Sequence, residues 1–168
     1  FTLGIVLEIV NALASAGIAV ALFPILWHCA RILGPAYASL RAIEASIGIV
    51  AAIGLLLLLT PSGSAIAIAF HDFAFNLVLM VFSVSTLILY PALFRFRVVP
   101  TILSIWGLIG GLMLLASSLL ILFGQFEMGS TTDTILSLPS WINEMALALW
   151  LIFRGVDLPK VNSGSKPN

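Results

Sequence analysis

The stretch AIAFHDFAFNLVLMVF, residues 67–82, decides the fold class because it reads as the interior of a membrane-spanning helix. All of its side chains are apolar except those of His71, Asp72 and Asn76. A charged side chain at the centre of a bilayer costs at least about 2.5–3.5 kcal/mol on insertion scales. We therefore expect these polar groups to face the interior of a helical bundle rather than lipid.

The composition of the whole chain indicates an integral membrane protein. Of its 168 residues, 61% are hydrophobic and 8% are charged, whereas about a quarter of the residues in an ordinary globular domain are charged. The formal net charge is zero, so we expect no nucleic acid partner, and membrane lipid is the expected surrounding. The single cysteine, Cys29, excludes an internal disulfide framework.

Five segments are long and apolar enough to span a bilayer, which requires about 20 residues. The breaks between them contain proline, glycine or charge, and short connections make consecutive helices antiparallel neighbours. We predict an all-α fold, a polytopic transmembrane bundle of five antiparallel helices over residues 1–155, followed by a polar cytoplasmic tail at 156–168. The predicted spans are 2–27, 36–60, 66–94, 101–124 and 136–154.

Six of the seven lysine and arginine residues lie at one side of this predicted bundle. They are Arg31, Arg95, Arg97, Arg154, Lys160 and Lys166. The opposite loops hold Glu127 and Asp133, so the positive-inside rule predicts a protein of the cell inner (plasma) membrane with its basic loops and C-terminus in the cytoplasm. The chain would then enter from outside at Phe1, which predicts a further span upstream. The expected interface anchors are Trp27, Tyr37, Tyr90, Trp106 and Trp150 near the basic side, and Trp141 near the other.

Polar side chains of the first, third and fifth spans are expected to share one layer in the outer half of the bundle. At a rise of about 1.5 Å per residue, Glu8, Asp72 and Glu144 lie roughly 8–12 Å below the outer hydrocarbon surface. The i,i+3 and i,i+4 spacings of the nearby amides keep each acid–amide pair on one helix face. We predict one ligand-binding cluster formed by Glu8, Asn11, His71, Asp72, Asn76, Asn143 and Glu144.

Three carboxylates in one layer of low dielectric need compensation. The alternatives are a bound cation, protonation of one or two acids, a protonated His71, or Arg41 reaching across from another level. Carboxylate, amide and imidazole groups suit Mg²⁺, Mn²⁺ or Zn²⁺, so a divalent cation is a candidate cofactor. Its candidate ligands are His71, Asp72, Glu8 and Glu144. Structural hydrogen bonding between protonated acids and amides is the alternative explanation of the cluster.

A secondary polar pair, Arg41 and Glu44, stands at i,i+3 spacing on the second span. An ion pair within the helix, with Arg41 extending to the membrane interface, would explain it without a further function. Alternatively, Glu44 lies near mid-membrane as a second station for a proton or cation, or Arg41 binds an anionic lipid head group.

Three segments together carry a resemblance to a known family. They are LGIVLEIVNALASAGIAVALFPIL (residues 3–26), HDFAFNLVLMVFSVSTLILYPALFRFRVVPTILSIWGLIGG (71–111) and LPSWINEMALALWLIFRG (138–155). The chain resembles a family of small bacterial multi-pass membrane proteins catalogued as a domain of unknown function. The resemblance implies a multi-pass architecture, with the N-terminal helix of the family absent here, and it implies no activity.

Three classes of function fit these residues. The first is binding or conduction of a cation, a proton or a small polar ligand by the acidic cluster. The second is a non-catalytic scaffold or accessory subunit, in a homo-oligomer or a larger membrane complex, whose polar residues only fix the helix register. An intramembrane hydrolase is the least favoured class because the sequence contains no GxSxG or HExxH motif.

Overall fold

The computed structural model describes residues 2–59 and 64–154, and this part of the chain contains helices and no strand. The helices are α1 (Thr2–Cys29), α2 (Leu33–Leu55), the short 3-10 helix η1 (Leu56–Leu59), α3 (Ser64–Arg95), α4 (Thr101–Leu122) and α5 (Thr131–Arg154). Each of the five α-helices is long and apolar enough to cross a membrane. The predicted all-α class with five spans is confirmed. The predicted tail at 156–168 lies outside the described residues.

The predicted start of the fifth span is wrong, because α5 begins at Thr131 rather than at residue 136. The polar residues before 136 form a capped helix start instead of a loop. The Asp133 backbone N–H donates to Ser130 Oγ at 3.3 Å, and Ser117 Oγ on α4 donates to Asp133 Oδ1 at 2.7 Å. Asp133 is therefore buried in the first turn of α5, where a carboxylate also suits the helix dipole.

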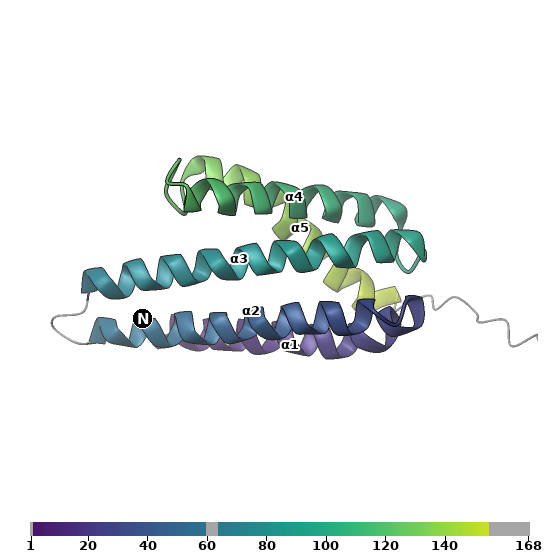
Figure 1. The fold of residues 1–168 in the computed structure, drawn as a ribbon, viewed down its shortest axis with the longest axis horizontal. Helices are drawn as coiled ribbons and strands as arrows, with labels where there is room; N and C mark the ends of the chain where they lie inside the picture. The colour runs from purple at the N-terminus through teal and green to yellow at the C-terminus, as the bar shows by residue number, and fades with distance from the viewer. Residues whose placement is uncertain (1, 60–63, 155–168) are drawn as a thin grey trace, which may run out of the picture.

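Consecutive helices pack against each other, and the chain runs back and forth along the bundle (Figure 1). From its start beside α4, α5 crosses behind α3 toward the end of the bundle where α1 and α2 are joined (Figure 1). The turns after α1 and α3 lie at this same end, as does the C-terminal end of α5. We call it the arginine end, because it carries Arg31, Arg95, Arg97 and Arg154.

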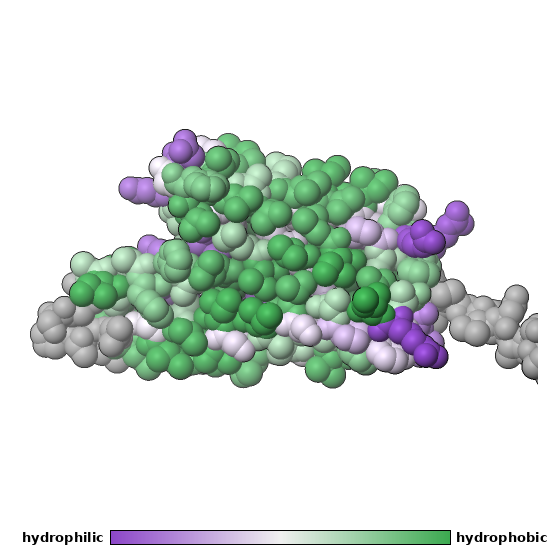
Figure 2. Space-filling view, viewed as in Figure 1, coloured by the Kyte–Doolittle hydropathy of each residue, from purple (hydrophilic) through white to green (hydrophobic). Residues whose placement is uncertain are grey.

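The buried core joins all five α-helices toward the arginine end. Tyr37 and Tyr90 are at most 1% exposed and belong to one buried cluster with Leu26, Leu93 and Leu147. Away from this core, many large apolar side chains are on the outside. Figure 2 shows them as a broad hydrophobic band, with strongly hydrophilic side chains gathered toward the ends of the visible face. This distribution suits a bundle surrounded by lipid.

Three glycines allow α4 to approach its two neighbours closely. A Cβ at Gly107 would overlap the Tyr90 ring, and one at Gly111 would overlap another side chain of α3. On a different face of α4, a Cβ at Gly110 would lie 2.9 Å from the backbone of Ser140 on α5. The small residues of α4 therefore serve helix contacts within the chain.

Candidate functional site

Arg41 and Glu44 form a buried ion pair on α2. Their side chains are 2% and 6% exposed, and Arg41 Nη1 lies 2.9 Å from Glu44 Oε1 and 3.1 Å from Oε2. The i,i+3 spacing places both side chains on one helix face. One turn earlier, Tyr37 Oη accepts a hydrogen bond of 2.9 Å from Arg41 Nε. The hypothesis that Arg41 extends to the membrane interface is wrong, because its guanidinium points into the bundle.

Side chains of α1 and α3 complete the surroundings of the guanidinium. Ser15 Oγ donates to Glu44 Oε1 at 2.6 Å and accepts from Arg41 Nη1 at 3.3 Å. The central carbon of the guanidinium lies 4.8 Å from the centroid of the Phe82 ring and 5.3 Å from that of Tyr37. Both distances are within the range of cation–π attraction. Three helices thus hold the cation in place.

Helix α5 brings a second carboxylate to this region. Tyr90 Oη donates to Glu144 Oε1 at 2.8 Å, and Asn143 Nδ2 donates to Tyr90 Oη at 2.6 Å. Tyr37, which bonds to Arg41, and Tyr90, which bonds to Glu144, belong to one buried cluster, so the two groups of side chains lie in the same region of the bundle. We call them together the central network; its members are Ser15, Tyr37, Arg41, Glu44, Tyr90, Asn143 and Glu144.

A second polar group lies nearer the N-terminal ends of α1 and α3. His71 Nε2 lies 3.2 Å from Glu8 Oε1, and His71 Nδ1 lies 3.2 Å from Asp72 Oδ1. We call these three residues the Glu8 group. The Asp72 side chain is 52% exposed, against 16% for His71. The Glu8 group is therefore open on its Asp72 side, and only part of the predicted cluster, Glu8, His71 and Asp72, comes together here.

A small cavity connects the Glu8 group with the central network. Its volume is about 30 Å³, and its polar lining comes from Glu8, Asn11, Ser15 and Glu44 on α1 and α2. A polar cavity of this volume can hold water. Asn11 borders the cavity, although its side chain is exposed. The cavity is therefore large enough to hold water between the Glu8 carboxylate and the side chains of Ser15 and Glu44.

Asn76 belongs to neither group. Its side chain is 3% exposed, and its Nδ2 donates to the backbone oxygen of Ser118 on α4 at 3.1 Å. The amide therefore joins α3 to α4, which is a sufficient structural reason for its presence in an apolar segment. Its Oδ1 atom has no hydrogen-bond partner among the described residues.

The prediction of one polar layer is wrong for Asn143 and Glu144. Both contact Tyr90, which follows Asp72 by 18 residues on α3, about 27 Å along the helix axis. The depth of Glu144 was misjudged because α5 begins early. Glu144 lies 13 residues after Thr131, about 20 Å into the helix rather than roughly 12 Å.

The described residues do not support the predicted divalent cation site. Among residues 2–59 and 64–154, no group of three His, Cys, Asp or Glu side chains is close enough together to hold a metal ion. Of the candidate ligands, Glu8, His71 and Asp72 interact with one another, and Glu144 is paired with Tyr90.

Two members of the central network, Tyr37 and Tyr90, were predicted only as interface anchors. Their buried hydroxyl groups instead bond to Arg41, Glu144 and Asn143. The i,i+4 spacing of Tyr37 and Arg41 was a usable signal, because residues at this spacing are neighbours on a helix. The contact of Tyr90 with α5 had no such signal, since it depends on how two helices cross.

Comparison with known proteins places the chain in a family. A family model described as a domain of unknown function (DUF4386) matches residues 1–155. The chain belongs to the DUF4386 family. The match covers all five helices of this DUF4386 protein, including every residue of the central network and the Glu8 group. No curated protein and no solved structure matches the chain.

Proposed function

We propose that this DUF4386 protein binds a proton in its central network and exchanges it with the Glu8 group across the small cavity. The observation that carries the proposal is the ratio of buried charges. One guanidinium, that of Arg41, is ion-paired with Glu44, and a second carboxylate, that of Glu144, lies in the same region and is bonded to Tyr90. With both acids ionised, the network would carry one uncompensated negative charge in the interior of a membrane protein.

An uncompensated charge in this position is strongly unfavourable. Moving an ion out of water costs several kcal/mol even after relaxation of the protein, and a charged group within a membrane normally has a partner. Among the described residues, the charged and titratable groups nearest to Glu144 are Tyr90 on α3 together with Tyr37, Arg41 and Glu44 on α2. Arg41 can balance only one acid, so a proton on the second acid completes the charge balance.

A proton fits this site better than a metal ion does. Both oxygens of Glu44 already accept from Arg41, and one also accepts from Ser15. One oxygen of Glu144 already accepts a hydrogen bond from Tyr90. Among residues 2–59 and 64–154, no group of three acidic, imidazole or thiol side chains is placed to hold a metal ion.

The polar groups form a route with an opening at each side. Asp72 is exposed beside His71, which contacts Glu8; the cavity then leads to Ser15 and Glu44. On the other side of the network, Tyr90 borders an open pocket at the arginine end. Proton transfer along this route would use carboxylates, an imidazole and hydroxyls, which all exchange protons readily.

The same proposal includes an orientation. The arginine end is placed in the cytoplasm of a bacterium, with the protein in the inner membrane and the Glu8 group facing outward. Support comes from the gathering of Arg31, Arg95, Arg97 and Arg154 at one end of the described residues, as the positive-inside rule requires. In this orientation, protons would enter at Asp72 and reach the central network from outside.

Proton flux into proteoliposomes tests the proposed function. Purified protein would be reconstituted with a pH-sensitive dye inside, and a potassium gradient with valinomycin would supply the driving voltage. We expect faster proton entry than in empty liposomes, and Glu144→Gln should return the rate to that of empty liposomes. Asp133→Asn is the matched control, because Asp133 is a buried carboxylate on the same helix that does not belong to the network.

The outcome that would overturn the proposal is equally clear. If folded Glu144→Gln protein conducts protons as fast as the unaltered protein, or if the unaltered protein does not conduct above empty liposomes, the central network is structural. The chain would then belong to the scaffold class, in which polar residues fix the packing of the helices.

A further inference from the structure

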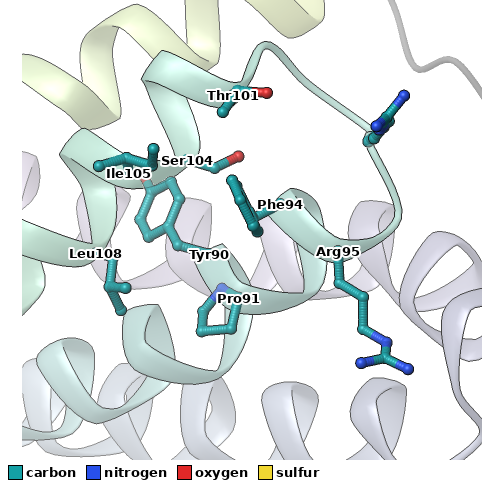
Figure 3. Close-up of a pocket in the computed structure, with 9 residues that line it drawn as sticks. Tyr90, Pro91, Phe94, Arg95, Thr101, Ser104, Ile105 and Leu108 are labelled. Carbon is teal, nitrogen blue, oxygen red and sulfur yellow. The ribbon is translucent and has the colours of Figure 1, made fainter.

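An open pocket of about 880 Å³ lies between α3 and α4 at the arginine end. Its polar lining includes Arg95, Arg97, Thr101 and Ser104, while Phe94 forms part of an apolar wall. Figure 3 shows Phe94 and Thr101 near Ser104, with Arg95 extending outward from the end of α3. The volume is within the range of pockets that hold a ligand of drug size.

Ser104 provides a hydrogen-bonding group that nothing in the described chain uses. Its side chain is 1% exposed, and its Oγ atom has no hydrogen-bond partner. Figure 3 shows this hydroxyl directed toward the side of the pocket where Phe94 and Thr101 lie. Buried polar atoms usually have a partner, so an acceptor bound in the pocket would satisfy Ser104.

The two arginines at the pocket form no ion pair with any described residue. Arg97 also has a backbone φ of 52°, in the left-handed region that normally favours glycine. It follows the last turn of α3, where the Val98 N–H bonds to the Leu93 oxygen at 3.1 Å, as in a Schellman motif. An arginine at the position where glycine is usual indicates that its guanidinium has a use.

The rest of the pocket is apolar and faces outward. Phe94 and Ile105 are 49% and 46% exposed, and Leu108 continues the wall of the pocket along α4. Because Thr101 begins α4, Leu108 lies about 10 Å deeper than the mouth of the pocket. Basic and hydroxyl groups thus line the pocket at the helix ends, and apolar side chains line it toward the membrane interior.

We propose that this pocket binds an anionic phospholipid of the leaflet at the arginine end. Its phosphate would accept from Arg95, Arg97, Thr101 and Ser104, and an acyl chain would lie along Phe94, Ile105 and Leu108. Basic pockets between helix ends recognise lipid head groups in this way. The apolar part of the pocket favours a lipid over free phosphate, because free phosphate would leave this part empty. Proton transport is not required for this binding.

Binding would be measured in detergent by native mass spectrometry, with phosphatidylglycerol as the probe and phosphatidylcholine as the zwitterionic comparison. We expect phosphatidylglycerol to be retained preferentially. Arg97→Gly should weaken its binding about fivefold, since a basic residue near an anionic surface contributes about 1 kcal/mol. This variant keeps the turn, because glycine suits the backbone at position 97. Ser104→Ala should also weaken binding.

Arg31→Gln is the matched control, because Arg31 has the same charge at the same end and does not line the pocket. It should bind phosphatidylglycerol like the unaltered protein. Equal loss in Arg31→Gln and Arg97→Gly would overturn the proposal in favour of nonspecific attraction to the arginine end. Retention of both lipids to the same extent, or displacement of the lipid by inorganic phosphate, would also overturn it.

Discussion

Arg41 and Glu44 form their ion pair inside the bundle, with Nη1 2.9 Å from Oε1 and both side chains almost fully enclosed. The pair is not isolated, because Glu144 on α5 bonds to Tyr90, which lies in one buried cluster with the Arg41 partner Tyr37. A buried pair contributes little net stability compared with apolar residues, but removing one partner leaves a charge without compensation. The ratio of one cation to two acids therefore predicts unequal effects of neutralising each member.

We expect Arg41→Gln to be far more harmful than Glu44→Gln. Without its guanidinium, the network contains two acids and no cation, and the free energy of unfolding should fall by about 3–5 kcal/mol. After Glu44→Gln, Arg41 still faces Glu144, and the loss should be about 1 kcal/mol. Thermal unfolding in detergent compares the two variants. Equal destabilisation would show that Glu144 does not share Arg41.

The Tyr90 hydroxyl is the second relationship with a measurable consequence. Tyr90→Phe would remove the acceptor of Asn143 Nδ2 and the donor to Glu144. Leaving buried groups without partners should lower the free energy of unfolding by about 1–3 kcal/mol. Ser46→Ala is the control, since the exposed Ser46 hydroxyl bonds only to a carbonyl of its own helix. If both variants unfold at the same temperature, the Tyr90 bridge contributes no stability.

The five helices could be predicted from the sequence, but the grouping of the polar residues could not. Hydropathy and length identify an apolar span, since the bilayer imposes about 20 residues on every span. Counting residues from the start of a helix gives only the height of a residue along that helix. It does not fix the direction in which the residue points or how two helices cross. Glu144 therefore contacts Tyr90 rather than Asp72. The pairing of Arg41 with Glu44 could be predicted because the two residues are three apart on one helix.

The error in the predicted start of α5 also changed the predicted site. Polar residues such as Ser130 and Asp133 were interpreted as a loop, although they cap and begin α5. This moved the predicted start of α5 from its true position and made Glu144 too shallow. The contact between His71 and Glu8 was within reach of the sequence, because both lie near the N-terminal ends of long helices that run in the same direction.

The contact of α4 with α5 predicts a strong effect of a small change. Gly110→Ala would place a methyl group 2.9 Å from the Ser140 backbone, which cannot rotate away as a side chain can. Overpacking of this kind should lower the free energy of unfolding by about 1–3 kcal/mol. Gly17→Ala is the matched control, since nothing lies within 4 Å of the added Cβ. There, alanine should be neutral or stabilise α1 by up to about 1 kcal/mol; similar losses in both variants would contradict the close contact.

The orientation of the bundle predicts which turns a membrane-impermeant maleimide can reach. In a Cys29→Ala background, Arg95→Cys and Gln125→Cys place thiols at exposed positions just before and just after α4. Gln125→Cys should react in intact cells, and Arg95→Cys only after permeabilisation, because three arginines remain to hold the arginine end in the cytoplasm. Reaction of Arg95→Cys alone in intact cells would reverse the orientation and place the Glu8 group inside. Reaction of both from outside would mean that α4 does not cross the membrane, because a spanning helix must separate the two thiols.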